Sequence, residues 1–236
     1  MKYTVKILLF CSIILIAQCN SVPPVSDSIK SDLEKNFAGC NFKCISGDCN
    51  NGEGTVEIEG KCFFARYKYI GSFKNGKPNG MGASYFLGDK MYEGEFKNGL
   101  PHGNVKLILD EGIGFEGSFR YGIKHGYGVE YIYNNKKLVK SYTGLWLNGN
   151  QEGLHYSKTN WGDKVYINER NYKNGQWNGP AKEYYIKDSS LYKYVGNYEN
   201  CIRHGKGKIY LVSFKPGKEI PNIECEYKNG KKHGEW

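Results

Sequence analysis

The sequence predicts an all-β protein built as an array of antiparallel β-hairpin repeats, about seven in number, with a half repeat at the front. Three observations support this fold class. A short motif recurs at steps of 23 to 29 residues. Each copy alternates large and small residues before a turn signal, most often Asn-Gly. Glycines also interrupt most windows before three helical turns could form, so long amphipathic helices are not expected.

Composition excludes two other classes of protein. Aromatic residues make up 15% of the chain, which is too many for a disordered chain. The mean hydropathy of -0.61 is too low for a chain that consists of membrane-spanning segments. We therefore expect a folded chain whose surface faces water.

Residues 1–18 have the features of a secretory signal peptide. Lys2 and Lys6 precede an apolar run, residues 7–17, which is too short to span a bilayer. The run ends in Ile-Ala-Gln-Cys, which resembles a bacterial lipobox, although Gln18 stands where a small residue is usual, as in the relaxed spirochaete version. We expect Cys19 to carry the lipid and the protein to be exported to the bacterial cell envelope, at the outer membrane or its periplasmic face. The alternative is ordinary signal cleavage nearby, with Cys19 uninvolved.

Residues 19–38 are polar, contain a Pro-Pro pair and show little periodicity, so we expect a tether. Residues 19–60 together carry three lysines against seven acidic residues. The formal net charge of the whole chain is +9, so an acidic leader is followed by a strongly basic body.

Residues 39–68 are expected to form a cysteine-rich cap that includes the half repeat, NNGEGTV. An even number of cysteines remains after the signal peptide and Cys19 are set aside, and in an exported chain this favours disulfides. Sequence does not settle the pairing. Our expectation within the cap is Cys44–Cys49 and Cys40–Cys62. A zinc site is the alternative, but the spacing lacks the C-x-x-C pairs that favour one.

Residues 69–236 form the repeat array. Its copies begin at Tyr69, Tyr92, Phe115, Tyr142, Asn168, Tyr194 and Ile223. Each copy has room for two strands of about five residues and a tight turn. Cys201 replaces the turn glycine of the sixth copy, and Cys225 replaces a strand glycine of the seventh. Two departures in adjacent copies suggest that these cysteines form a disulfide with each other.

The glycines of a copy have two expected roles. Gly76 supplies the positive φ of a turn. Gly71 and Gly82 lie in strands, where they would allow a large ring to pack against bare backbone. The cost of a strand glycine, about 0.5–1 kcal/mol, is smaller than the gain from burying an aromatic side chain, about 1.5–3 kcal/mol.

The pattern Y-x-G-x-F/Y-x-N-G-x-x-x-G-x-G closely resembles the MORN repeat (membrane occupation and recognition nexus), over roughly residues 50 to 236. The resemblance implies an elongated, single-layer antiparallel ribbon with a shallow groove on one face, and a role in binding and scaffolding without catalysis. Leu154, His155, Asn168 and Arg170 depart from the pattern. We therefore expect the ribbon to be less regular, and to bend, near residues 150–180.

Two sets of residues are candidates for binding surfaces. An aromatic stripe recurs at one repeat position, and we expect it to form mainly the core of the array, with part of it available to line a groove: Tyr69, Tyr92, Phe115, Tyr142 and Tyr194. A basic edge recurs two residues before the turn glycine: Lys74, Lys97, Arg120, Lys173 and Lys228. This edge could attract anionic lipid headgroups, or it could serve solubility and discourage association between edges.

No catalytic motif emerges from the sequence, so we expect no enzyme activity, cofactor or metal. His102, His125, His204 and His233 each precede a glycine at equivalent repeat positions, which lie about 10 Å apart in neighbouring repeats and cannot share one metal ion. We expect these histidines to accommodate a positive φ in a turn.

Two hypotheses for function follow. The first is an exported, lipid-anchored scaffold that binds a protein through its repeat surface, and the second is a peripheral module that binds anionic phospholipid or cell-wall polymer through the basic edge. The last copy has little sequence after its turn, so end-to-end pairing into a homodimer is a further alternative. Nucleic acid is not an expected partner of an exported chain.

Overall fold

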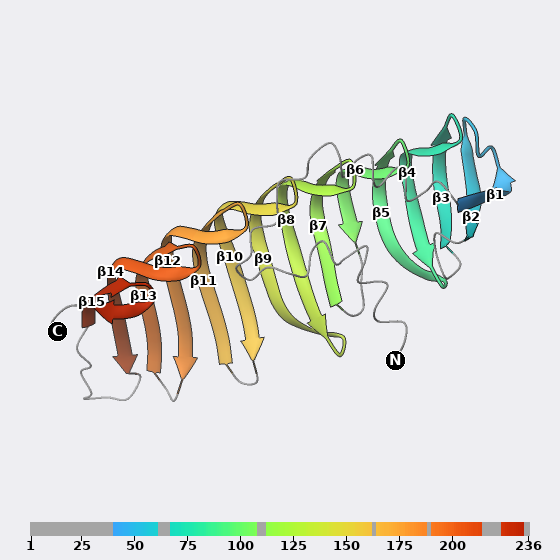
Figure 1. Ribbon diagram of the computed structural model, residues 1–236. Coiled ribbons are helices and arrows are strands. Elements are labelled where there is room, and N and C mark those ends of the chain that lie inside the picture. The colour runs from blue at the N-terminus through green and yellow to red at the C-terminus, as the bar shows by residue number, and fades with distance from the viewer. Residues whose placement is uncertain are drawn as a thin grey trace.

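A computed structural model describes residues 40–60, 67–107, 112–161, 164–187, 190–213 and 223–233. The structure is one open antiparallel sheet in which each strand pairs with the next in chain order, from β1 to β16 (Figure 1). The predicted all-β, single-layer hairpin array is therefore confirmed. The expected signal peptide, Cys19 and the tether lie outside the described residues, as do the side chains of Cys40 and Cys62.

The strands are mostly longer than the five residues expected, because turns take up little of each repeat. Their bounds are β1 (Cys40–Gly47), β2 (Glu53–Gly60), β3 (Tyr67–Lys74), β4 (Lys77–Phe86), β5 (Asp89–Lys97), β6 (Leu100–Leu107), β7 (Gly112–Arg120), β8 (Ile123–Asn134), β9 (Lys137–Leu147), β10 (Asn150–Trp161), β11 (Lys164–Lys173), β12 (Gln176–Lys187), β13 (Ser190–Glu199), β14 (Ile202–Ser213), β15 (Ile223–Lys228) and β16 (Lys231–His233). The seven copies correspond to the hairpins from β3–β4 to β15–β16, and the half repeat lies in a further hairpin, β1–β2.

The turn within each copy lies on one edge of the sheet. In the first copy Asn75 and Gly76 have φ values of 50° and 69°, which is the pattern of a type I′ hairpin turn. Cys201 takes the glycine position of the sixth copy with a φ of 68°. The expected turn role of the histidines is wrong, because His102, His125 and His204 do not have a positive φ. The glycine after each of them does, with φ between 63° and 87°.

Neighbouring turns are joined by hydrogen bonds between repeats. The residue at the glycine position of each turn donates its N–H to a carbonyl of the preceding hairpin: Gly76 to Asn50, Gly99 to Pro78, Gly122 to Pro101, Gly149 to Lys124, Gly175 to Gln151, Cys201 to Trp177 and Gly230 to Arg203. We call this series the turn ladder. It links each repeat to the one before it along the whole edge.

Side chains reinforce the turn ladder in some copies. Glu152 accepts a hydrogen bond from the N–H of Asn174 at 2.9 Å, and Asn51 accepts one from the N–H of Asn75 at 3.1 Å. His102 lies in the same repeat position, with its Nδ1 3.5 Å from the N–H of Tyr121. This contact, rather than a positive φ, is what the structure shows for His102.

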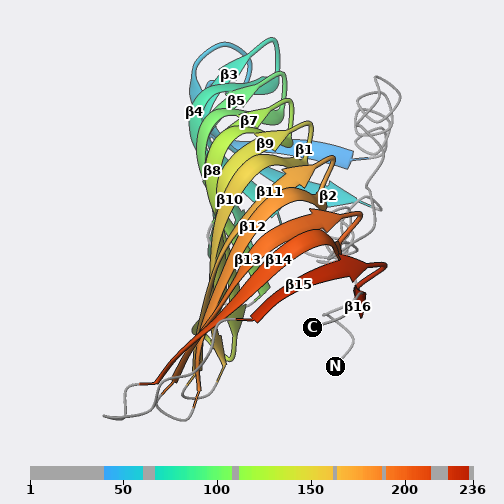
Figure 2. The same ribbon diagram turned by 90° about the vertical axis from the view of Figure 1, so that its left-hand side faces the viewer.

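One face of the sheet, the inner face, carries the core. The strands are strongly curved, and the inner face is their concave side (Figure 2). The aromatic stripe is buried there, with Phe115 completely buried and the other four members at most 7% exposed. Rings from adjacent repeats contact each other edge to face, as Tyr69 and Phe96 do at a centroid distance of 4.8 Å. A single-layer sheet thus obtains a core by packing rings along its own surface.

Strand glycines make room for these rings, as the sequence predicts. Gly71 and Gly82 face each other across β3 and β4, and the ring of Tyr69 lies over both. A Cβ atom at Gly82 would come within 2.3 Å of the Tyr69 hydroxyl oxygen. The same hydroxyl donates a hydrogen bond to the Ser72 carbonyl, which a register shift in β3 leaves available.

The fourth copy reverses this arrangement. His155 stands where the pattern has its second strand glycine, and its ring lies over Gly144 on the preceding strand, where an added Cβ would be 2.5 Å from the imidazole. The imidazole also contacts Trp146 and Tyr172. Burial lowers the pKa of His155, so the neutral ring is favoured. Strand pairing continues without a break from β9 to β13, so the departures do not interrupt the sheet.

The cysteines agree only in part with expectation. Cys44 and Cys49 form a disulfide across the first turn, which confirms that pair. The expected Cys201–Cys225 bridge is wrong, because Cys225 is a free, buried thiol while Cys201 belongs to another disulfide. Cys225 takes the place of a strand glycine and packs in the core with Tyr194 and Tyr227, so its substitution for glycine has a packing explanation instead.

Candidate binding surfaces

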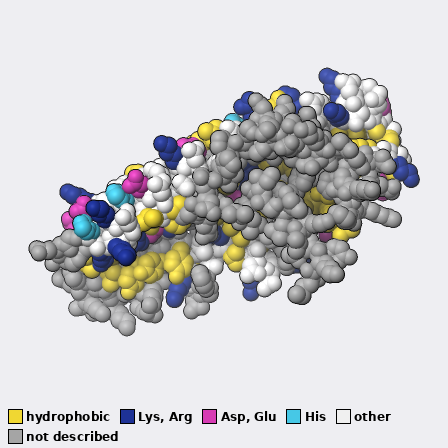
Figure 3. Space-filling model, viewed as in Figure 1, with side chains coloured by type: hydrophobic (Ala, Val, Ile, Leu, Met, Phe, Trp, Pro, Cys, Tyr) yellow, Lys and Arg dark blue, Asp and Glu magenta, His cyan; other side chains and the backbone are white. Residues whose placement is uncertain are grey.

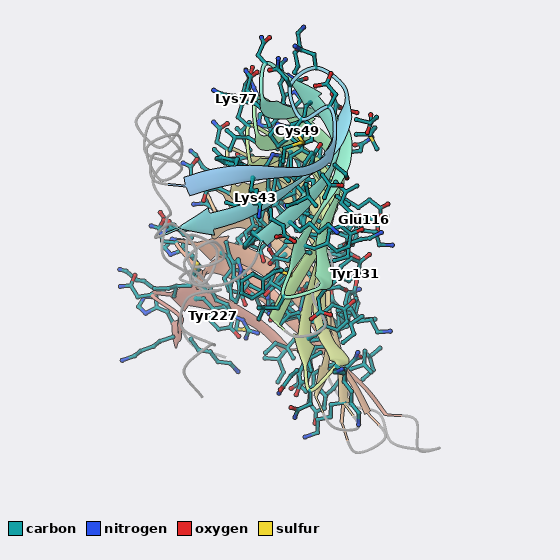
Figure 4. The ribbon with its side chains drawn as sticks, turned by 90° about the vertical axis from the view of Figure 1, so that its right-hand side faces the viewer. Lys43, Cys49, Lys77, Glu116, Tyr131 and Tyr227 are labelled. Atoms are coloured by element: carbon teal, nitrogen blue, oxygen red, sulfur yellow. A yellow bond between two sulfur atoms is a disulfide. The ribbon has the colours of Figure 1, made fainter. Side chains whose placement is uncertain are left out.

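A groove lies on the face opposite the core, which we call the outer face. Figure 4 shows the two faces: Glu116 and Tyr131 project from the outer face, and Tyr227 lies on the inner one. The groove has a volume of about 890 Å³ and extends over β10 to β16. Its lining includes Gly196 and Gly207. We call it the outer groove.

A ladder of cross-strand neighbours crosses the outer groove. Strand register places Glu169, Lys182, Val195, Lys208 and Glu224 side by side on successive strands. Lys182 pairs with Glu169 at 3.0 Å, and Lys208 pairs with Glu224. Both lysine side chains are about half exposed, so these pairs remain accessible to solvent and contribute little to stability.

The charges that line the outer groove are balanced. Three lysines and three glutamates contribute to it: Lys182, Lys206, Lys208, Glu169, Glu224 and Glu226. Apolar side chains lie at its border, among them Leu154 with 42% of its surface exposed. Tyr156, next to Glu169 across β10 and β11, is 52% exposed. Balanced charges with adjacent apolar groups suit a ligand of mixed polarity.

A buried cluster of charges lies on the inner face of the same region. Glu183 pairs with both Arg170 and Arg203, and it accepts a hydrogen bond from Tyr198 at 2.7 Å. The Arg170 guanidinium stacks on Trp177 at 3.9 Å. Burial alone would raise the pKa of Glu183, but the Arg170 charge and the hydrogen bonds from Tyr198 and the two arginines hold it below its ordinary value. The fifth copy has Asn168 where most copies have an aromatic ring. Arg170 therefore fills the space that this ring would occupy.

The basic edge lies beside the turn ladder, and all five of its side chains are exposed. It is not continuous, because Leu147 and Glu199 take the equivalent position in the fourth and sixth copies. Lys124, which follows its turn, does not extend the edge. It is buried between Phe115 and Trp146 and pairs with Glu130.

Comparison with known families agrees with the geometry. Five segments match the MORN repeat family: residues 69–86, 92–104, 115–137, 194–213 and 226–235. These matches support a MORN repeat protein. No curated protein matches the chain. Residues 138–193, which include His155, Asn168 and Arg170, lie between matched segments, so the unmatched part coincides with the altered core packing.

MORN repeats are commonly protein- or lipid-binding scaffold modules, and the family is non-enzymatic. In this chain the described residues hold no group of three or more His, Cys, Asp or Glu side chains arranged to bind a metal ion. Over the same residues, no helix has the length and hydropathy needed to cross a membrane.

The two binding surfaces predicted from sequence lie in different places. The aromatic stripe is the core and is closed to a partner, and the basic edge is exposed along the turns. A groove on one face was implied by the resemblance, but the face and the lining residues of the outer groove were not predicted. A signal for it existed in the residue between the Tyr and Gly of each motif, Glu169, Val195 and Glu224 in the last copies, which alternation places on the outer face.

Proposed function

We propose that this protein is an exported, lipid-anchored scaffold that binds a protein partner through the outer groove. Cys19 would hold the chain at the envelope membrane, and residues 19–38 would act as its tether. The repeat array would then present the groove to the partner without catalysing a reaction.

The charge balance of the outer groove carries this proposal. Because its lysines and glutamates are equal in number and two lysines pair with glutamates, the groove offers no excess positive charge to an anionic polymer. A polypeptide segment with charges of both signs could exchange partners with these exposed pairs while its apolar side chains contact Leu154 and Val195. Such complementarity favours specificity more than affinity.

The direct test uses the repeat array without its anchor as bait for detergent-solubilised envelope. Val195→Trp places a large ring inside the groove and is expected to abolish partner capture. Ile70→Trp is the matched control, because Ile70 occupies the same repeat position in the first copy and lies on the exposed outer face away from the groove. Loss of capture by both variants, or by neither, would contradict the groove as the binding surface.

The anchor is tested separately by labelling cells with a palmitate analogue. The expected result is label on the wild-type protein and none on Cys19→Ala. Label that survives the substitution, or its absence from the wild type, would remove lipidation at Cys19 from the proposal.

The basic edge supports a second candidate, binding to anionic phospholipid or cell-wall polymer. The observation in its favour is the exposure of all five cations along one edge. Each could add about 1 kcal/mol near an anionic surface. Binding to anionic vesicles should collapse as salt rises, since the screening length is about 8 Å at 0.15 M. Partner capture through the groove should persist under the same conditions.

A further inference from the structure

A second surface lies on the inner face, beside the buried core. Strand register places Lys140, Thr159, Tyr166, Tyr185 and Tyr192 next to one another on β9 to β13. We call these residues the tyrosine row. Their side chains are only partly buried, and hydrophobic groups are visible over the ends of β11 to β14 in Figure 3. The tyrosine row therefore extends the inner face beyond its closed core.

The three rings of the tyrosine row are stacked. Tyr185 and Tyr192 are almost parallel, with an interplanar angle of 2° and centroids 4.6 Å apart, and Tyr166 stacks on Tyr185 at 5.7 Å. Stacking fixes the rings before any ligand arrives, so binding to them costs little conformational entropy. The stack ends on the side of Thr159 and Lys140.

Among the described residues, the buried and half-buried cations on the inner face of this region pair with a carboxylate, with one exception. Lys124 pairs with Glu130, while Arg170 and Arg203 share Glu183. Lys140 is the exception, because it has no carboxylate partner within the described part of the chain. Its ammonium group lies over the ring of Tyr142, 4.6 Å from the centroid.

The environment of Lys140 disfavours its positive charge. Burial, together with the charge of the nearby Arg170, lowers the pKa of Lys140 to about 8 against the opposing effect of Glu130. Polar groups surround it: Thr159 is its cross-strand neighbour, and Ser157 and Asn168 are buried side chains in the adjacent row, hydrogen-bonded to each other. A negative group placed here would restore the balance that the neighbouring cations already have.

We propose that Lys140 and Thr159 bind a carboxylate from an acidic polypeptide side chain, with Tyr166 and the rings behind it receiving the adjacent residue of that polypeptide. A carboxylate is favoured because glutamates pair with Lys124, Arg170 and Arg203 on this face. A polypeptide is favoured because the site combines one cation with a fixed aromatic surface, which suits an acidic residue next to an apolar or aromatic one. The site lies on the opposite face from the outer groove and does not depend on it.

The test is a titration of the purified repeat array, followed through the side-chain NMR signals of Lys140. The probe is the blocked dipeptide acetyl-Glu-Tyr-amide, and acetyl-Gln-Tyr-amide is the neutral control. A bound carboxylate favours the ammonium form, so the Lys140 titration midpoint should rise from about 8 by about 1 pH unit. The glutamine peptide should leave it unchanged.

Variants separate the site from general attraction to a basic protein. Lys140→Met should abolish saturable binding of the acidic dipeptide, while Lys158→Met should retain it, because Lys158 lies on the adjacent strand but on the exposed outer face. If Lys140→Met fails to fold, the titration midpoint of Lys140 in the wild-type protein, measured with the acidic dipeptide, still tests the proposal. An unchanged midpoint at saturating dipeptide, or equal binding by both variants, would overturn the proposal. Neither result would affect partner capture through the outer groove.

Discussion

The ring of Tyr69 lies against the backbone of Gly82 on the next strand, so close that even a methyl group at Gly82 would overlap it. Gly82→Ala should therefore destabilise the array by about 1–3 kcal/mol, because the ring must leave its site or the strands must separate. Chemical denaturation measures this difference directly.

Gly114→Ala is the matched control for this substitution. Gly114 also lies in a strand, but a Cβ there would be 3.3 Å from its nearest neighbour, the Leu107 carbonyl. We expect a much smaller loss of stability. Equal losses in the two variants would show that strand glycines matter for a reason other than ring packing.

The Glu152 side chain contacts the turn of the next repeat, so we expect its removal to destabilise that turn locally. Glu152→Ala removes the acceptor for the Asn174 N–H and should cost about 1 kcal/mol, comparable to the loss of a helix cap. Hydrogen exchange at the Asn174 amide should accelerate. Asn178 occupies the same position in the next copy without a bond to Asn200 among the described residues, so Asn178→Ala should leave the Asn200 amide unaffected.

Glu183 predicts a dependence of stability on pH. Because its pKa in the folded state lies below the ordinary 4.5, its stabilising effect is complete above that value and is lost as the pH falls through the folded-state pKa. Glu183→Gln should destabilise the protein by about 3 kcal/mol at neutral pH, since two arginines lose their shared partner. Thermal melts from pH 7 to pH 3 should show a smaller acid sensitivity in the variant. A parallel decline in both proteins would contradict this role.

Asn168 and Arg170 both depart from the repeat pattern in the fifth copy, and we expect the stability effects of substituting them to be coupled. In an Ala181→Gly background, Asn168→Tyr alone should destabilise, because Arg170 occupies the space for the ring. Arg170→Gly alone should destabilise by removing a partner of Glu183. Together they recreate the tyrosine-over-glycine arrangement, so a double-mutant cycle should show a favourable coupling above about 1 kcal/mol. Additive effects would mean that the introduced ring and the Arg170 side chain do not compete for the same space in the core.

The thiol of Cys225 is 6% exposed in the folded protein. Iodoacetamide should therefore leave Cys225 unmodified under native conditions and alkylate it in denaturant, as mass spectrometry of the unreduced protein can show. Cys44 and Cys49 should remain unmodified in both conditions because they are bonded to each other. A Cys201–Cys225 disulfide in that experiment would contradict the structure.

Most of the fold could be predicted from sequence because its determinants are local. Alternation, Asn-Gly turns and glycines opposite rings all act within one repeat or between adjacent ones, so the period alone specifies the sheet order. The prediction of a Cys201–Cys225 disulfide was wrong because each cysteine meets a local requirement, turn geometry at Cys201 and core packing at Cys225. The pairing of Glu183 with Arg170 and Arg203 could not be predicted, since it joins residues from three strands whose registers shift at bulges.

The turn ladder has a consequence for how such a protein changes over time. Each hairpin docks onto the carbonyl of its predecessor through a backbone N–H, which every residue except proline can provide. A duplicated hairpin could donate to the equivalent backbone carbonyl of its predecessor. It would also provide the same acceptor for the hairpin that follows it. The length of the protein is therefore free to vary by whole hairpins, while the stretch around Arg170 and Glu183 is tied to its particular neighbours and cannot be copied singly.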